Sequence, residues 1–371
     1  MTEESLPPLP LPPGLRARVI PHVNGLHMHV LEAGEPGRPL ILLLHGFPEL
    51  AYSWRHVMGP LAAAGYHVVA PDQRGYGRTT GADTRFEADL AAYRLMNLAR
   101  DAMGLVAALG APRVRLLVGH DFGSPVAAYA ALIRPDLFPA LVLMSAPFAG
   151  PPARLGDGAP PPGQDIQAEL AAIGRKHYHW YYSTPEADAD MCGAPQGLAA
   201  FLRGYYHMKS ADWPLNAPHP LAAWTAEELA KLPTYYVMKL HETMAQTVAP
   251  HTPARAAPWL TEAELAVYAA EYARTGFQGG LNWYRIRTSR RFDADLEAFA
   301  GRAIAVPSLF IAGAADWGIH QVPGALERMN GTACTAMRAV HLLPGAGHWV
   351  QQEQPAAVTR HLLDFLATLP E

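Results

Sequence analysis

The stretch Val114-Arg-Leu-Leu-Val-Gly-His-Asp-Phe-Gly-Ser-Pro-Val-Ala-Ala-Tyr129 carries the strongest indication of the fold. Its apolar first part predicts a buried strand, and the part after Gly123 is compatible with a helix. Between them stands Asp121, with a glycine two residues away on each side. This spacing is typical of a sharp strand-to-helix turn that presents a nucleophile at its tip, with aspartate here where serine is common. Taken alone, the pentapeptide at 119–123 is also compatible with an ordinary tight turn.

Other short apolar runs along the chain resemble the one that precedes this turn. Runs of this length, rich in Val, Ile and Leu and bounded by Gly or Pro, predict strands covered on both faces of a parallel sheet. They span 40–45, 67–71, 114–119, 140–145, 308–312 and 340–343. Helical stretches lie between them, at 90–109 and 124–133. The alternation predicts an α/β protein with a doubly wound, mostly parallel sheet.

The alternation of strands and helices stops at about residue 147 and resumes near 305. The segment between is rich in helix signals, and Thr225 and Thr261 each begin a predicted capping box. The second of these helices is expected to end at Thr275, before Gly276. A proline-rich connector is expected at 148–164. We therefore expect one α/β domain, 1–147 and 301–371, interrupted by a helical insertion at 148–300.

Composition excludes several classes of protein. At 371 residues and a net charge of −4, without a basic stripe, the chain is not expected to bind nucleic acid. Cys192 and Cys334 are too few for a disulfide framework and suit a reducing compartment. The acidic, proline-rich N-terminus does not resemble a secretory signal, and no long apolar window predicts an integral membrane segment. The expected location is cytoplasmic. No zinc-ligand spacing or nucleotide-binding loop occurs, so neither a metal nor another cofactor is expected.

Three further segments support a nucleophile at Asp121. His45-Gly-Phe-Pro48 follows the strand predicted at 40–45, and the loop at this place supplies N–H groups to an oxyanion hole in proteins with such a turn. The expected donors are the backbone N–H groups of Phe47 and Phe122, and His45 is interpreted as structural. Asp316 follows one later strand and His348 follows the next. Nucleophile, acid and histidine in this order predict a catalytic triad.

With these residues identified, the chain resembles the soluble epoxide hydrolases of the α/β-hydrolase superfamily over nearly everything after about residue 15. The resemblance lies in HGFPELAYSWR at 45–55, DQRGYG at 72–77, GHDFGS at 119–124 and GFQGGLNWYR at 276–285. It implies an α/β-hydrolase fold in which the insertion is a helical cap domain. It also implies a covalent alkyl-enzyme ester on Asp121, formed from a small apolar epoxide and hydrolysed by water to a vicinal diol.

The same resemblance implies two tyrosines of the cap that activate the epoxide oxygen. The block at 276–285 places one of these roles on Tyr284. Tyr178, seven residues before Pro185, resembles the second, with Tyr181 and Tyr182 as alternatives. The chain departs from many relatives in having Phe122 where they have Trp and in a longer cap around 231–257. The resemblance therefore does not define the shape of the pocket.

Several alternatives share part of this chemistry. A haloalkane or haloacid dehalogenase also uses an aspartate nucleophile, but Phe122 lacks a ring N–H to hold halide. A serine esterase is disfavoured because Ser124 lies three residues beyond the tip of the turn. A non-catalytic binding protein of the same fold does not need a triad and an oxyanion loop. Epoxide hydrolysis by a monomer or homodimer is the expectation that remains.

Overall fold

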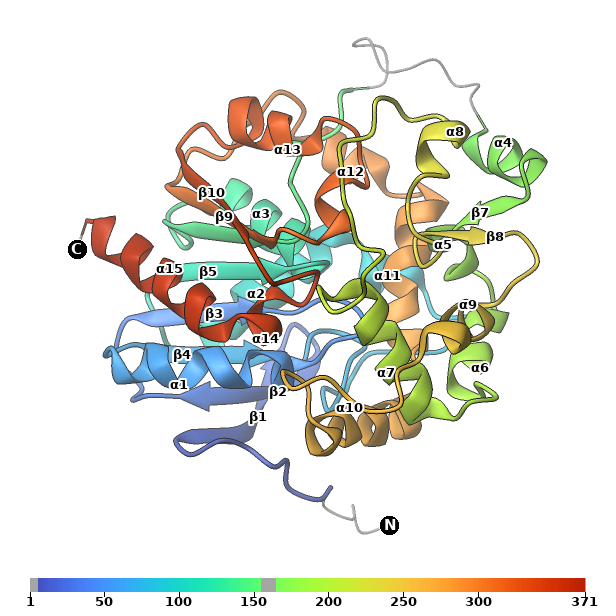
Figure 1. Ribbon diagram of the computed structural model, residues 1–371. Coiled ribbons are helices and arrows are strands. Elements are labelled where there is room, and N and C mark those ends of the chain that lie inside the picture. The colour runs from blue at the N-terminus through green and yellow to red at the C-terminus, as the bar shows by residue number, and fades with distance from the viewer. Residues whose placement is uncertain (1–5, 155–164, 371) are drawn as a thin grey trace.

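The computed structural model describes residues 6–154 and 165–370, and its main feature is an eight-stranded sheet (Figure 1). The strand order is β1-β2-β4-β3-β5-β6-β9-β10. The parallel strands are β3 (Leu40–Leu44), β4 (His67–Pro71), β5 (Val114–His120), β6 (Leu141–Met144), β9 (Ser308–Gly313) and β10 (Met337–Leu343). Each predicted strand coincides with one of these, and the predicted α/β sheet is confirmed.

Two strands at one edge of the sheet were not predicted. β1 (Leu15–Val23) and β2 (Leu26–Ala33) form an antiparallel hairpin, and β2 pairs antiparallel with β4. Most residues of β1 are exposed, so this strand lacks the apolar run that marks a buried strand. Asn24 and Gly25 both have positive φ, 49° and 82°, as a tight hairpin turn requires. The Asn-Gly pair is the sequence signal from which this hairpin could have been predicted.

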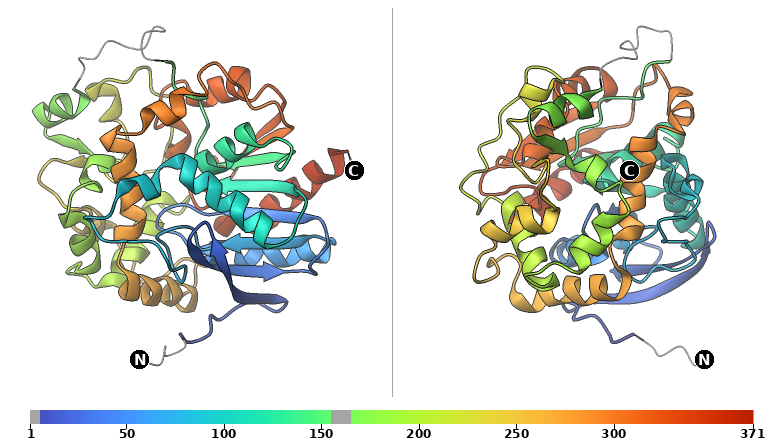
Figure 2. Two further views of the ribbon diagram at one scale, coloured as in Figure 1. Left: turned by 180° about the vertical axis from the view of Figure 1, so that it is seen from behind. Right: turned by 90° about the vertical axis from the view of Figure 1, so that its right-hand side faces the viewer.

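Helices cover both faces of the sheet. α1 (Arg55–Ala63) and α15 (Pro355–Thr368) lie against one face, and α2 (Leu95–Ala108) and α3 (Gly123–Ile133) lie against the other, as the view from behind in Figure 2 shows. The helix predicted at 90–109 is interrupted at Arg94, which is extended with φ −60° and ψ 145°. A short 3₁₀ turn, Leu90–Tyr93, precedes the break.

The insertion between β6 and β9 is mostly helical and lies over the carboxyl ends of the parallel strands (Figure 1). Its described elements are α4 (Ile166–Ala172), β7 (Arg175–His177), α5 (Tyr178–Tyr181), α6 (Glu186–Cys192), α7 (Leu198–Lys209), α8 (Ala226–Leu229), β8 (Val237–Lys239), α9 (Met244–Val248), α10 (Glu262–Thr275), α11 (Gln278–Ser289) and α12 (Asp293–Glu297). The antiparallel pair β7–β8 was not predicted. We propose 148–300 as a cap on the core formed by 1–147 and 301–371. Part of the predicted connector, 155–164, lies outside the described residues.

The two predicted capping boxes differ in the structure. At α10 the box is complete, because the Thr261 side chain accepts from the Glu264 N–H and the Glu264 carboxylate accepts from the Thr261 N–H. The helix ends at Thr275, and Gly276 follows with φ 65°. At α8 the Thr225 side chain accepts from the Glu228 N–H, but the carboxylate of Glu228 turns to the Ala222 N–H. The box predicted there is only half formed, and the helix has four residues.

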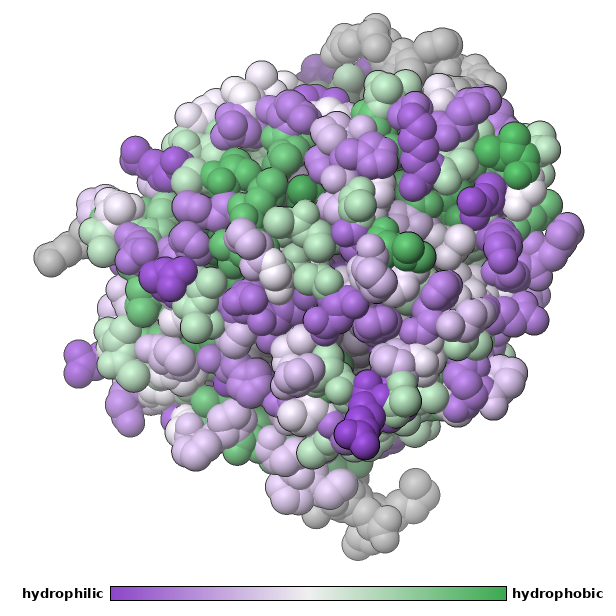
Figure 3. All heavy atoms as spheres, viewed as in Figure 1, coloured by the Kyte–Doolittle hydropathy of each residue, from purple (hydrophilic) through white to green (hydrophobic). Residues whose placement is uncertain are grey.

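On the face shown in Figure 3, hydrophilic side chains are spread over core and cap, with a smaller group of hydrophobic ones near α13 (Ala325–Arg328) and β10. Within residues 6–154 and 165–370, no helix is long and apolar enough to cross a membrane.

Candidate active site

Asp121 lies at the tip of the turn between β5 and α3 and has a positive φ of 50°. This conformation is uncommon for a residue with a side chain and is found at strained functional turns. The chain passes very close here, because a Cβ added at Gly123 would lie 2.4 Å from the Leu44 carbonyl oxygen. A Cβ at Gly46 would lie 2.2 Å from Asp121 Oδ1. The glycines are therefore required by close approach, and the predicted strand-to-helix turn is present.

The Asp121 carboxylate is held in its ionised form. The Phe47 N–H donates to Oδ1 at 2.9 Å, and Oδ2 lies 3.3 Å from His348 Nε2. Burial by itself would raise the pKa of Asp121, but the close contact with His348 and its charge, together with the charge of Lys209, bring it well below its usual range. A carboxylate in this state is ready to act as a nucleophile at neutral pH.

His348 lies between two carboxylates. Its Nδ1 is 3.1 Å and 3.2 Å from the two oxygens of Asp316, which fixes the ring and favours the Nδ1–H tautomer. Its buried Nε2 has no aligned hydrogen-bond partner among the residues that the structure describes, although Asp121 lies nearby. Burial and the charge of Lys209 lower the pKa of His348. Asp316 and Asp121 raise it by a larger amount, so the net shift is upward. The raised pKa makes His348 a stronger base, and Nε2 is the nitrogen that faces Asp121.

The loop predicted to supply oxyanion-hole N–H groups lies beside Asp121. The Phe47–Pro48 peptide bond is cis, and the Phe47 N–H points at the Asp121 carboxylate. Phe122 follows Asp121 directly and precedes the first residue of α3, so its N–H belongs to a helix N-terminus. His45 is fully buried, with Nδ1 2.9 Å from the Gly46 carbonyl oxygen and Nε2 accepting from the Gln73 N–H. These backbone contacts support its interpretation as a structural residue.

The two preferred cap tyrosines lie next to each other across from Asp121. The rings of Tyr178 and Tyr284 are 5.6 Å apart, and the Tyr284 ring packs edge-on against Phe122 at 4.6 Å and Phe47 at 5.3 Å. The Tyr178 hydroxyl donates to Gln321 Oε1 at 3.1 Å. Burial raises the pKa of both phenols well above the usual value, and the nearby charge of Asp121 acts in the same direction. Both therefore remain protonated hydrogen-bond donors.

The alternatives to Tyr178 are placed less favourably. The Tyr181 hydroxyl donates to the Asp190 carboxylate, within the cap. Tyr182 lies 5.0 Å from the Tyr284 ring, but it is fully buried and its hydroxyl has no partner among the described residues. Tyr178, by contrast, lines the same cavity as Asp121. The geometry favours Tyr178 as the partner of Tyr284.

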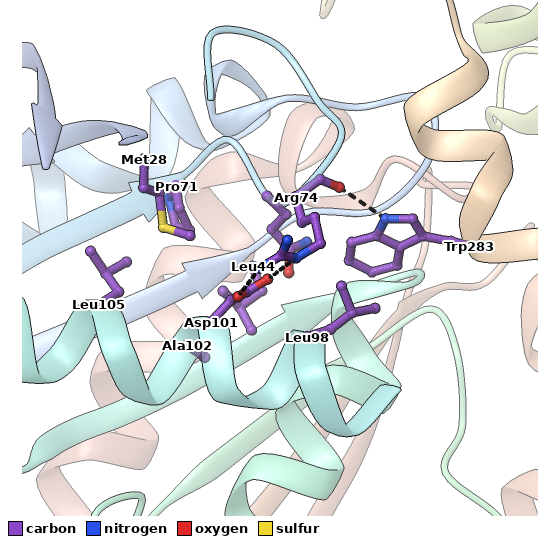
Figure 4. Close-up of a pocket in the computed structure, with 10 residues that line it drawn as sticks. Met28, Leu44, Pro71, Arg74, Leu98, Asp101, Ala102, Leu105 and Trp283 are labelled. Atoms are coloured by element: carbon purple, nitrogen blue, oxygen red, sulfur yellow. Dashed lines mark hydrogen bonds and ion pairs between the residues drawn. The ribbon is translucent and has the colours of Figure 1, made fainter. Parts of the chain in front are cut away.

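A cavity of about 480 Å³ opens over Asp121 and is suited in size to a small organic molecule. Its walls come from both core and cap and include Phe122, Tyr178, Trp283 and Gln321. A second cavity, shown in Figure 4, measures about 10 Å³ and holds at most about one water molecule. Only the larger cavity is a candidate substrate pocket.

The residues around the small cavity anchor the cap helix that carries Tyr284 (Figure 4). The Trp283 indole N–H donates to the Arg74 carbonyl oxygen at 2.9 Å. Arg74 in turn donates to both carboxylate oxygens of Asp101 on α2, at 2.8 Å and 2.7 Å. A cap residue adjacent to Tyr284 is thus tied to the core.

Several buried polar groups near the site were not predicted. Glu49 is fully buried, lies 2.6 Å from His120 Nδ1 and accepts from the side-chain amides of Gln351 and Gln352. His120 Nε2 is 2.7 Å from the carbonyl oxygen of His348. Glu49 and His120 lie inside the blocks at 45–55 and 119–124 that carry the family resemblance, so their position in the chain was the available signal.

Comparison with known proteins agrees with this geometry. Residues 39–189 match the family model of the alpha/beta hydrolase fold. The chain is 40% identical to epoxide hydrolase A of Mycobacterium tuberculosis over 352 residues, 93% of this chain and 96% of the relative. Epoxide hydrolase B of the same species is 34% identical over 363 residues, 93% and 97% of the two chains.

Solved structures give the same result. An epoxide hydrolase from an endophytic Streptomyces has a TM-score of 0.77 and 34% identity and covers 96% of each chain. Potato (Solanum tuberosum) epoxide hydrolase I has a TM-score of 0.73 and 32% identity and covers 96% of this chain and all of its own. The protein is therefore a hydrolase of the α/β-hydrolase fold. Within that class it belongs to the epoxide hydrolase family, as the sequence resemblance predicts.

Proposed function

We propose that this protein converts small apolar epoxides and water into vicinal diols through a covalent ester on Asp121. The observation that carries the proposal is the position of the ionised Asp121 carboxylate. It faces the His348–Asp316 pair on one side, and it lines the same cavity as Tyr178, whose ring lies 5.6 Å from that of Tyr284. An ionised carboxylate needs no base for its attack.

In the first step, an oxygen of Asp121 attacks one carbon of the strained ring. A carbon–oxygen bond forms to the carboxylate, and the bond from that carbon to the ring oxygen breaks. The ring oxygen takes a proton from Tyr178 or Tyr284, because an alkoxide is a very poor leaving group in water. Since burial keeps both phenols protonated, either one can hydrogen-bond to the oxygen as its charge develops.

In the second step, His348 removes a proton from a water molecule that attacks the ester carbonyl carbon. Asp316 orients the imidazole and stabilises its charge. Negative charge develops on the former carboxylate oxygen, where the N–H groups of Phe47 and Phe122 form the oxyanion hole. The bond between the carbonyl carbon and the substrate oxygen then breaks, and that oxygen takes the second proton of the attacking water from the new carboxyl group. The diol leaves, the Asp121 carboxylate is restored, and the proton held by His348 returns to the tyrosinate. No redox partner or further reactant is needed for this balance.

The structure disfavours the dehalogenase alternative. Holding a halide ion beside Asp121 calls for an N–H donor at position 122, and the Phe122 ring has none. The indole N–H of Trp283 lies nearby but is already bound to the Arg74 carbonyl oxygen. The phenols of the cap are suited instead to an oxygen leaving group. We expect diol formation from a styrene-oxide-type epoxide and no halide release from a chloroalkane.

The experiment that tests the mechanism is a single turnover in heavy-oxygen water. The first diol released should carry oxygen from Asp121 and not from the solvent, because water attacks the carbonyl carbon and not the substrate carbon. In the variant His348→Gln, the ester should form but not break down. Its intact mass should then increase by one substrate equivalent. Solvent oxygen in the first-turnover diol would overturn the covalent route.

A further inference from the structure

A buried lysine at the end of cap helix α7 lies beside the His348 loop without a carboxylate partner. Lys209 is only 2% exposed, and its ammonium forms no ion pair with any residue in the part of the chain that the structure describes. Burying an unpaired charge is costly, so lysines are rarely found in such places without a compensating interaction.

Four aromatic rings surround the Lys209 ammonium. Nζ lies 4.7 Å from the ring centroid of Tyr236, 5.3 Å from those of Tyr205 and Trp349, and 5.9 Å from that of Tyr235. Aromatic faces attract cations, most strongly where water is excluded, so this cage favours the charged form. The cage compensates for burial without neutralising the charge as an ion pair would.

The Lys209 charge remains available at neutral pH. Burial lowers the pKa of Lys209 to about 8, while the charges of Asp121, Asp316 and Glu49 oppose that shift. Glu49 already contacts His120. The buried positive charge of Lys209 therefore interacts electrostatically with Asp121 and Asp316, the carboxylates of the proposed triad.

Backbone and ring contacts fix this charge relative to His348. The His348 N–H donates to the Lys209 carbonyl oxygen at 2.8 Å. Trp349, the next residue, contributes one wall of the cage and donates from its indole N–H to the Tyr206 carbonyl oxygen at 2.8 Å. The backbone of His348 is thus bonded to that of Lys209, and the cap supplies the contact.

We propose that Lys209 is a positioning residue that favours the neutral, proton-accepting form of His348 while the ester on Asp121 is hydrolysed. The proposal rests on the proposed function. The titratable groups that face the His348 loop are Asp121 at the elbow, Asp316 after β9, His120 on β5, Glu353 on α14 (Val350–Glu353) and Lys209 on α7.

Lys209 matters most after the first step. In the alkyl-enzyme Asp121 is an ester and has lost its charge, so Asp316 is left as the near carboxylate that favours protonated His348. Lys209 opposes this effect of Asp316, because a positive charge nearby disfavours the positively charged form of His348. The same ammonium favours the oxyanion that forms on the former Asp121 carboxylate. Both effects act on ester hydrolysis and neither assists ester formation.

The test is the pH dependence of the two half-reactions in Lys209→Met and Lys209→Gln, measured with styrene oxide in single turnovers. Without the ammonium, the pKa of His348 rises. The acid limb of ester hydrolysis, which is the fall in its rate at low pH, should then move up by about one pH unit. Below that limb, hydrolysis should be about tenfold slower than in the wild type at the same pH. The alkyl-enzyme should accumulate, while its rate of formation stays near the wild-type value.

Two matched variants complete the design. Lys209→Arg keeps the charge and should retain the wild-type acid limb. Lys239→Met, at an exposed lysine paired with Glu242, should leave both half-reactions unchanged. If Lys209→Met or Lys209→Gln lowers hydrolysis equally at every pH with an unmoved acid limb, Lys209 only packs the cage and the proposal is wrong. Failure of the proposed function is separate, since then His348→Gln forms no alkyl-enzyme at all.

Discussion

The core and the cap bring different kinds of group to the cavity and hold them by different means. The core supplies charged groups on the ends of strands, with Asp121 on its strained turn and Asp316 bound to the ring of His348. The cap supplies neutral phenols, Tyr178 and Tyr284, which are held mainly by aromatic packing. In the proposed mechanism the core forms and hydrolyses the ester, and the cap selects the leaving group.

Replacing the nucleophile should have the largest effect, because the contribution of the core cannot be supplied by the cap. We expect Asp121→Ala to lower kcat by about 10⁴-fold or more, since no other carboxylate stands at the tip of the turn. Diol formation from styrene oxide measures this, with circular dichroism as the control for folding. Residual activity within about tenfold of the wild type would show that another group is the nucleophile.

Replacing a cap phenol should be less severe and should affect only the first step. We expect Tyr284→Phe to slow ester formation by about 10²-fold, because one proton donor to the ring oxygen is lost. Tyr178→Phe should act in the same direction. Ester hydrolysis, followed in a pre-formed alkyl-enzyme, should not change.

Tyr181→Phe is the matched control for these variants. Its hydroxyl is bound to Asp190 inside the cap, so this substitution should leave ester formation at the wild-type rate. If Tyr181→Phe slowed ester formation as much as Tyr178→Phe does, the loss in rate would come from disturbed packing of the cap. The assignment of a proton donor to Tyr178 would then fail.

The difference between core and cap also explains what the sequence could predict. The turn at Asp121 is specified locally, because close backbone approach requires Gly123 and a short apolar strand must precede it. Asp316 and His348 follow strands that are recognisable by composition, so chain order alone brought them together. Local rules of this kind predicted the parallel strands, and they also singled out the three residues that the structure brings together, Asp121, Asp316 and His348.

What could not be predicted depends on contacts between distant segments. The strand β1 is mostly exposed and carries little apolar signal, although Asn24-Gly25 marks its turn. The cage around Lys209 combines rings from α7, from the segment before β8 and from the loop after β10. No spacing rule relates such positions. The interruption of the predicted helix at Arg94 is a smaller feature that was likewise not predicted from the sequence.

The pH dependence of the two steps should separate the nucleophile from the base. The pKa of Asp121 is lowered, so the carboxylate stays ionised as the pH falls and ester formation should be nearly constant from about pH 8 to pH 5. In the alkyl-enzyme, where Asp121 is an ester, Asp316 still raises the pKa of His348 and Lys209 lowers it, so the neutral base is lost as the pH falls through the His348 pKa. Ester hydrolysis should then drop about tenfold per pH unit. Parallel profiles for the two steps would contradict this division.

The smallest expected effect concerns the anchor between cap and core. In Trp283→Phe the indole N–H is lost, and the buried carbonyl oxygen of Arg74 loses its donor, at a cost of about 1–3 kcal/mol in the free energy of unfolding. Because Tyr284 is the next residue on α11, ester formation should also slow by a few-fold, with hydrolysis unaffected. Trp259→Phe removes an indole hydrogen bond to Asp212 at the surface, and so it serves as the control with little change in either quantity. If Trp283→Phe lowers stability but leaves ester formation untouched, the aromatic packing of Tyr284 against Phe47 and Phe122 is sufficient to hold the phenol. The core would then position the cap tyrosine through the oxyanion loop itself.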